Sequence, residues 1–166
     1  QLNRRVRELH WIVRALSELN AGEPNHIDGP SAAFASFRNR MALDSLILCG
    51  HSFGGATALH VMMDDKNGLL DTNQTKPLAE VVRSVICLDP WMYPLSEEVI
   101  ESAPLKVPAL IIHAEKWQWE YNMQRETKVV SRAEAGLVHL RLKDAGTCVF
   151  AWTLFACLFL TECVVV

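Results

Sequence analysis

One serine of this chain lies in a sequence pattern that favours nucleophilic chemistry. The residues Gly50-His51-Ser52-Phe53-Gly54 fit the G-x-S-x-G motif, in which a serine occupies a sharp turn between a strand and a helix. The flanking glycines suit this turn because the backbone folds back too tightly to admit a Cβ. We therefore expect Ser52 at the end of a strand as a nucleophile, with the amide of Phe53 placed to bind an oxyanion.

The sequence on both sides of this turn has the composition that the motif needs. The apolar run 46–49 has the length of a buried parallel strand, and Gly55-Ala56-Thr57-Ala58 supplies small residues where a helix must lie close to a sheet. The alternative interpretation is a glycine-rich turn that binds an anion or only bends the chain.

A serine hydroxyl becomes a good nucleophile when a histidine takes its proton and a carboxylate orients that histidine. Asp89 directly follows the strand predicted over 81–88, and parallel strands end at the same sheet edge, so we expect it near Ser52. The alternative for Asp89 is a cap of the turn before Pro90.

The histidine is the missing member of this predicted triad. The motif places it after a late strand, but residues 143–150 contain no histidine. His139 falls within the strand predicted over 137–142, and His51 belongs to the turn itself. We interpret the other candidates as surface residues of helices or strands. These candidates are His10, His60 and His113.

The elements that must position these residues alternate between helix and strand. Helices are predicted over 2–19, 53–63, 96–104 and 117–131, and strands over 46–49, 81–88, 109–114 and 137–142. A short helix with Phe34, Phe37 and Met41 and a polar surface segment over 64–77 complete the series. This alternation predicts the α/β class, with a mostly parallel sheet and helices on both faces.

We expect a partial catalytic domain over 1–147 and an atypical hydrophobic tail over 148–166. The stretch 145–161 carries no charged residue, yet it is shorter than the ~20 apolar residues of a membrane span. The tail is interpreted either as a buried C-terminal helix or as a segment foreign to the domain. The first helix is interpreted as a cover of the sheet, with a membrane-surface helix as the alternative.

Composition excludes several classes of protein. The 166 residues are 50% hydrophobic with a net charge of -3, which indicates one globular domain and offers no basic stripe for nucleic acid. The five cysteines lack paired metal spacing, so we expect no disulfide framework, zinc site or other cofactor. No signal peptide or initiating methionine opens the sequence, which favours a piece of a longer chain and leaves the compartment open.

Three blocks of the sequence together resemble a known family. They are Gly50-His51-Ser52-Phe53-Gly54-Gly55-Ala56-Thr57, Leu88-Asp89-Pro90-Trp91-Met92-Tyr93-Pro94-Leu95, and Trp117-Gln118-Trp119 with Asn122. In these blocks, and over about 1–147, the chain resembles the platelet-activating factor acetylhydrolases of the plasma and cytosolic type II kind. The resemblance implies an α/β-hydrolase fold and a calcium-independent esterase that removes short sn-2 acyl groups from phospholipids.

The resemblance also implies site residues and partners. It makes Ser52 the nucleophile, Asp89 the triad acid and the Phe53 amide an oxyanion donor. It suggests that Trp91, Met92 and Trp117 line the apolar side of the substrate, with core packing as the alternative for each. The implied partners are a phospholipid substrate and a membrane or lipoprotein surface, without a metal or other cofactor.

The chain departs from the family pattern in three places. The early strands of the family would lie before Gln1, a polar insert lengthens the spacing between Ser52 and Asp89, and Cys148-Val149 stand where the histidine belongs. Since loss of a triad member costs about four powers of ten in turnover, we expect an impaired esterase. The alternatives are a non-catalytic lipid- or protein-binding remnant and another carboxylic-ester hydrolase.

Overall fold

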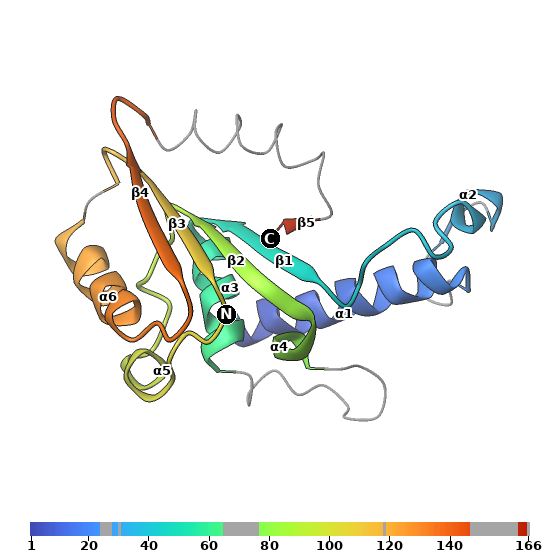
Figure 1. The fold of residues 1–166 in the computed structure, drawn as a ribbon, viewed down its shortest axis with the longest axis horizontal. Coiled ribbons are helices and arrows are strands. Elements are labelled where there is room, and N and C mark those ends of the chain that lie inside the picture. Colours follow the sequence, from blue (N-terminus) through green and yellow to red (C-terminus); the bar gives the residue numbers. More distant parts are fainter. Residues whose placement is uncertain (24–27, 30, 65–76, 118, 147–162, 166) are drawn as a thin grey trace.

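The strands form one parallel sheet. The structure is a computed structural model, which describes residues 1–23, 28–29, 31–64, 77–117, 119–146 and 163–165. The described strands are β1 (Leu46–His51), β2 (Val82–Leu88), β3 (Ala109–Ala114), β4 (Leu137–Leu142) and β5 (Cys163–Val165). Their order is β4-β3-β2-β1-β5, and every neighbouring pair is parallel (Figure 1). The predicted α/β class is confirmed.

Helices connect most of these strands, as the sequence predicts. They are α1 (Leu2–Ala21), α2 (Ser31–Ala35), α3 (Phe53–Met63), α4 (Leu78–Val81), α5 (Glu97–Ser102) and α6 (Glu120–Ser131). Ser96 caps α5 as expected of a helix start, since its hydroxyl accepts the amide of Val99 at 3.2 Å. None of the described helices is both long enough and apolar enough to cross a membrane.

Some predicted element bounds were wrong. The short helix α2 ends at Ala35, before Phe37 and Met41, and Phe37 is 46% exposed. Helix α6 begins at Glu120 rather than at Trp117. The one-turn helix α4 and the three-residue strand β5 were not predicted, because such short elements carry no periodic signal. The predicted surface segment over 64–77 and most of the tail lie outside the described residues.

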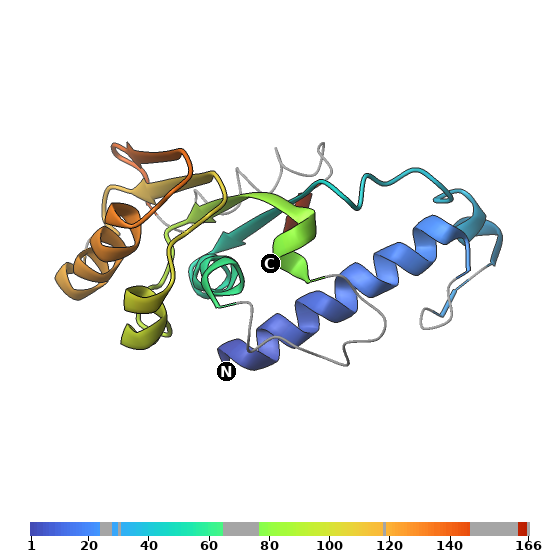
Figure 2. The same cartoon turned by 60° about the horizontal axis from the view of Figure 1, so that its bottom comes forward.

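The main core fills one face of the sheet. Alternate strand residues, among them Leu48, Val85 and Ile111, pack with apolar residues of α1, α3 and α5 in a single cluster. Figure 2 shows these three helices on the same side of the sheet. The opposite strand face carries a smaller cluster that contains Cys49 and Leu88. The second helical layer expected from the sequence is not among the described helices.

Three histidines that we expected at the surface are buried instead. The exposed fractions of His10, His60 and His113 are 8%, 5% and 0%. The prediction failed for His60 because α3 lies between the sheet and other helices, so its residues from Gly55 to Met63 are all buried. It failed for His113 because β3 is an interior strand.

We expect the burial of His60 to destabilise the protein in mild acid. Burial lowers the pKa of His60, with the nearby Asp64 opposing, and neither ring nitrogen has a hydrogen-bond partner among the described residues. The unfolded chain therefore binds a proton near pH ~6.5 that the folded chain resists, so stability falls as the pH drops below that value. Urea unfolding should show this loss between about pH 6.5 and 5.

The variant His60→Gln should lose stability less steeply over the same pH range. The difference in slope has an upper limit of about 1.4 kcal/mol per pH unit, the value for one proton. Parallel stability curves for the two proteins would contradict the assignment to His60.

Candidate active site

The backbone at Ser52 makes a sharp turn between a strand and a helix. Strand β1 ends at His51 and helix α3 begins at Phe53, so Ser52 alone makes the turn. Its φ is 54° and its ψ is -113°, a conformation that a residue with a side chain rarely adopts. The amide of Ser52 donates to the carbonyl of Leu88 at 2.9 Å, and the carbonyl of Ser52 accepts from the amide of Trp91 at 2.9 Å. These bonds to β2 and the following loop hold the strained turn.

Two glycines let the backbone close around this turn. A Cβ on Gly50 would lie 2.3 Å from the backbone carbon and oxygen of Gly54. A Cβ on Gly55 would lie 3.0 Å from Pro90 Cβ and 3.1 Å from Gly50 O. Gly50 is therefore required by the turn itself, and Gly55 allows the loop after β2 to pack against the start of α3.

Asp89 lies beside Ser52 at the carboxyl edge of the sheet. His51 pairs with Leu88 in the register of β1 and β2, so Ser52 and Asp89 each stand one residue beyond a paired end. The side chain of Asp89 is fully buried, and its backbone has a φ of 43°. The structure thus brings the predicted nucleophile and the predicted acid to one place.

The two carboxylate oxygens of Asp89 have different surroundings. Oδ1 accepts the amide of Ala114 at 2.7 Å and lies 3.5 Å from Nδ1 of His113. Oδ2 is buried and has no hydrogen-bond partner among the described residues. A buried acceptor of this kind can take an N–H donor such as an imidazole.

Helix α6 holds the loop that follows Asp89. Asn122 accepts the amide of Met92 at 2.6 Å and donates to the carbonyl of Pro90 at 3.0 Å. Arg125 donates to the carbonyls of Met92 and Leu95 and pairs with Glu97. Sequence reasoning did not find Arg125, because a polar residue in a polar helix has no signal of burial, yet it is 4% exposed.

Aromatic residues extend from the elbow to the surface. The rings of Phe53 and Trp91 lie 6.2 Å apart, and those of Trp91 and Tyr93 stack at 6.0 Å. A hollow of about 260 Å³ is lined by Trp91, Tyr93, Trp119, Tyr121 and Asn122. Trp91 therefore lies between the elbow and an aromatic hollow.

The other two residues expected to line the substrate site have different positions. Met92 is fully buried within the main core. Trp117 is half-buried with its ring 4.8 Å from that of Trp119, and its indole nitrogen has no partner within the described part of the chain.

A group of titratable residues, two of them buried, adjoins Asp89. His113 Nε2 lies 2.9 and 2.8 Å from the two carboxylate oxygens of Glu126, and His139 Nε2 lies 3.3 Å from Glu126 Oε1. Burial alone lowers the pKa of His113, but the carboxylates of Asp89 and Glu126 more than offset it and raise the pKa to about 9. Burial also lowers the pKa of His139, against the attraction of Glu126. The sequence had singled out neither Glu126 nor this contact.

One family model matches most of the chain. The family model described as platelet-activating factor acetylhydrolase, isoform II, matches residues 1–144. The chain belongs to this family. The resemblance stated from the three sequence blocks is thus confirmed.

Curated relatives of the same description match most of the chain. Platelet-activating factor acetylhydrolase of Bos taurus is 26% identical over 129 residues, which cover 77% of this chain and 26% of the relative. The relative from Cavia porcellus is 27% identical over 154 residues, covering 87% of this chain and 31% of the relative. That from Canis lupus familiaris is 24% identical over 132 residues, covering 79% and 26%. The chain spans between a quarter and a third of the length of these acetylhydrolases.

The described part of this acetylhydrolase-family chain does not place a base on Ser52. His113 and His139 direct ring nitrogens to Glu126, and no described histidine is hydrogen-bonded to the Ser52 hydroxyl. The position expected for the family histidine, at Cys148-Val149, lies outside the described residues.

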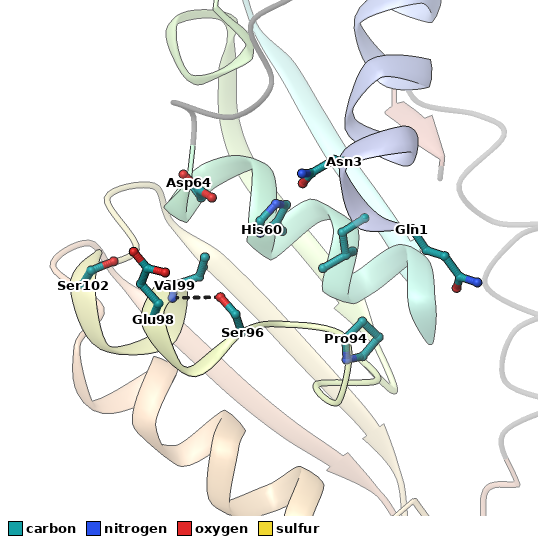
Figure 3. Close-up of a pocket in the computed structure, with 10 residues that line it drawn as sticks. Gln1, Asn3, His60, Asp64, Pro94, Ser96, Glu98, Val99 and Ser102 are labelled. Atoms are coloured by element: carbon teal, nitrogen blue, oxygen red, sulfur yellow. Dashed lines mark hydrogen bonds between the residues drawn. The ribbon is translucent and has the colours of Figure 1, made fainter.

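A larger pocket of the chain lies away from this site. Its volume is about 590 Å³, and it is bordered by the start of α1, the end of α3 and helix α5 (Figure 3). Polar groups of Asn3, His60, Asp64 and Glu98 line it, and neither Ser52 nor Asp89 does. We therefore do not assign it to the acetylhydrolase site.

We expect Gly50→Ala to destabilise the protein, because the added Cβ would lie 2.3 Å from the backbone of Gly54. The cost should be about 2–3 kcal/mol, as for other overpacked positions, and urea unfolding measures it. Gly136→Ala is the matched control, since a Cβ there has no heavy atom within 4 Å. Equal unfolding midpoints for the two variants would show that the turn is not as tight as described.

Proposed function

We propose that this chain carries the nucleophile and acid of a serine esterase of the platelet-activating factor acetylhydrolase type. The observation that supports this most directly is the strained backbone of Ser52 beside Asp89. Ser52 follows the end of β1 and Asp89 follows the end of β2, and these two strand ends are paired. The family assignment supports the same reaction class. In this proposal Ser52 is the nucleophile, Asp89 the triad acid and the Phe53 amide an oxyanion donor.

The proposed reaction is transfer of an acyl group to the serine and then to water. Ser52 Oγ bonds to the ester carbonyl carbon as its proton passes to a base, and the negative oxygen faces the Phe53 amide at the start of α3. The ester bond breaks, and the lysophospholipid leaves with a proton. Water then attacks the acyl-enzyme, and the short carboxylic acid is released.

The aromatic hollow supports an apolar substrate group beside the elbow. In the proposal, Trp91 contacts the acyl or alkyl chain, because its ring lies between Phe53 and the hollow. Met92 and Trp117 would support this surface by packing rather than contact the substrate, because Met92 is buried and Trp117 is half-buried. The exposed rings of Tyr93, Trp119 and Tyr121 would face the phospholipid aggregate that presents the substrate.

The proposal includes impaired turnover. No described histidine is placed to accept the proton of the Ser52 hydroxyl, which leaves this hydroxyl a weak nucleophile. Loss of one triad member costs about four powers of ten in turnover. A non-catalytic remnant that keeps the apolar hollow is the second candidate, and it is favoured because no described histidine is hydrogen-bonded to Ser52.

Two measurements distinguish these candidates. We expect hydrolysis of a short-chain sn-2 phospholipid ester to be about four powers of ten slower than that of an intact serine esterase, because the base is missing. We also expect slow labelling of the chain by a fluorophosphonate probe at Ser52, which the elbow exposes to the reagent.

The labelling should disappear in Ser52→Ala and persist in Ser45→Ala, which changes an exposed serine just before β1. Labelling that survives Ser52→Ala would refute the assignment of the nucleophile. No labelling of the folded wild type would favour the non-catalytic remnant. Turnover equal to that of an intact esterase, abolished in Ser52→Ala, would contradict the proposed impairment.

A further inference from the structure

We propose that His113, Glu126 and His139 form a binding site for a zinc ion. The three residues come from β3, α6 and β4, and each offers one ligand atom. None of the three ligands is a member of the proposed triad, although His113 lies beside Asp89. Zinc binding and esterase turnover are measured separately, so each proposal can fail without the other. The expectation that the chain has no zinc site rested on its cysteine spacing, whereas these ligands are far apart in sequence and are brought together by the sheet.

The distances between the ligand atoms suit a small cation. The three ligand atoms lie within 4.8 Å of one another, with His113 Nε2 2.8 Å and His139 Nε2 3.3 Å from the Glu126 carboxylate. In a tetrahedral zinc site with bonds of about 2.0–2.1 Å, neighbouring ligand atoms are about 3.3 Å apart. Two of the three separations are therefore near or below this spacing, and the third, at most 4.8 Å, must shorten for all three atoms to bind one ion.

The types of ligand favour zinc over other common cations. Two imidazoles and one carboxylate are a known zinc set that leaves a fourth position for water. Calcium and magnesium prefer oxygen ligands, which this site supplies only through Glu126. The rings of His113 and His139 meet edge to face, with centroids 5.1 Å apart. Both rings direct Nε2 to the Glu126 carboxylate.

Asp89 lies near the second ring nitrogen of His113, which has no hydrogen-bond partner among the described residues. Metal-binding histidines usually donate their second ring N–H to a carboxylate or carbonyl, which fixes the ring orientation. His113 Nδ1 lies 3.5 Å from Asp89 Oδ1, on the side of the ring opposite to Glu126. The arrangement is therefore carboxylate, histidine, then the proposed ion.

The site combines buried ligands with an access route. The side chains of His113 and Glu126 are each 1% exposed, while that of His139 is 33% exposed. Zinc can enter past His139, and water can occupy the remaining position.

The test is zinc binding by the full chain after treatment with a chelator. In competition with a chromophoric chelator, we expect one zinc ion per chain at this site, with affinity reduced about 100-fold or more in Glu126→Gln and in His139→Asn. At 100 times the dissociation constant, zinc should raise the Tm of the wild type by about 5–10 °C. Glu120→Gln, on the first turn of the same helix, is the matched control and should bind as the wild type does.

The five cysteines make a second readout necessary. Cobalt substituted at the proposed site should lack a thiolate-to-metal charge-transfer band, because its ligands are nitrogen and oxygen. His139→Asn, at a partly exposed position, keeps the test valid if Glu126→Gln fails to fold, which circular dichroism without metal reveals. The proposal is refuted by absence of zinc binding, by equal affinity in the wild type and folded His139→Asn, or by a thiolate spectrum of the cobalt protein.

Discussion

The candidate site depends on the close approach of two backbone segments, the turn after β1 and the loop after β2. The Ser52 amide donates to the last carbonyl of β2, and the Trp91 amide donates back to the Ser52 carbonyl. A positive φ at Ser52 costs free energy, and these bonds offset it because they form only with the turn in this conformation. The same closeness requires glycine at positions 50 and 55, where a Cβ would lie against backbone or Pro90.

Helix α6 stabilises this arrangement with polar rather than apolar side chains. Asn122, Arg125, Glu126 and Val129 are its buried residues and recur at helical spacing, but only the last is apolar. The buried polar groups are hydrogen-bonded to the loop after β2 or to His113, which avoids the cost of unpaired burial. The helix thereby fixes both the loop beside Ser52 and the histidine beside Asp89. Helix α6 therefore both packs against the sheet and positions these groups by hydrogen bonds.

Short sequence patterns correctly predicted the strands and helices whose residue types are restricted by burial or close packing. The apolar run before Ser52, the small residues after it and the run 109–114 each indicated their element, since burial of a strand or close packing of a helix restricts residue type. The buried face of α6 was not predictable in this way, because hydrophobic periodicity cannot reveal a face whose contacts are polar. His113 was misplaced for a related reason. Its burial follows from the sheet order, and its partners lie in the loop after β2 and in α6, beyond the range of a local sequence pattern. Short elements such as α4 were not predicted, because one helical turn is too short to show a hydrophobic periodicity.

The surroundings of Asp89 explain how its carboxylate stays in position although Oδ2 has no hydrogen-bond partner among the described residues. A fully buried carboxylate is costly unless other groups stabilise its charge. Its Oδ1 accepts a hydrogen bond from the Ala114 amide, and His113 lies on the same side. Because the pKa of His113 is raised to about 9, its imidazolium form balances the negative charge of the carboxylate. This support comes from β3, behind the acid, and leaves Oδ2 available. The position of Asp89 is therefore set by the sheet and by the Ala114 amide, independently of any group that approaches Ser52.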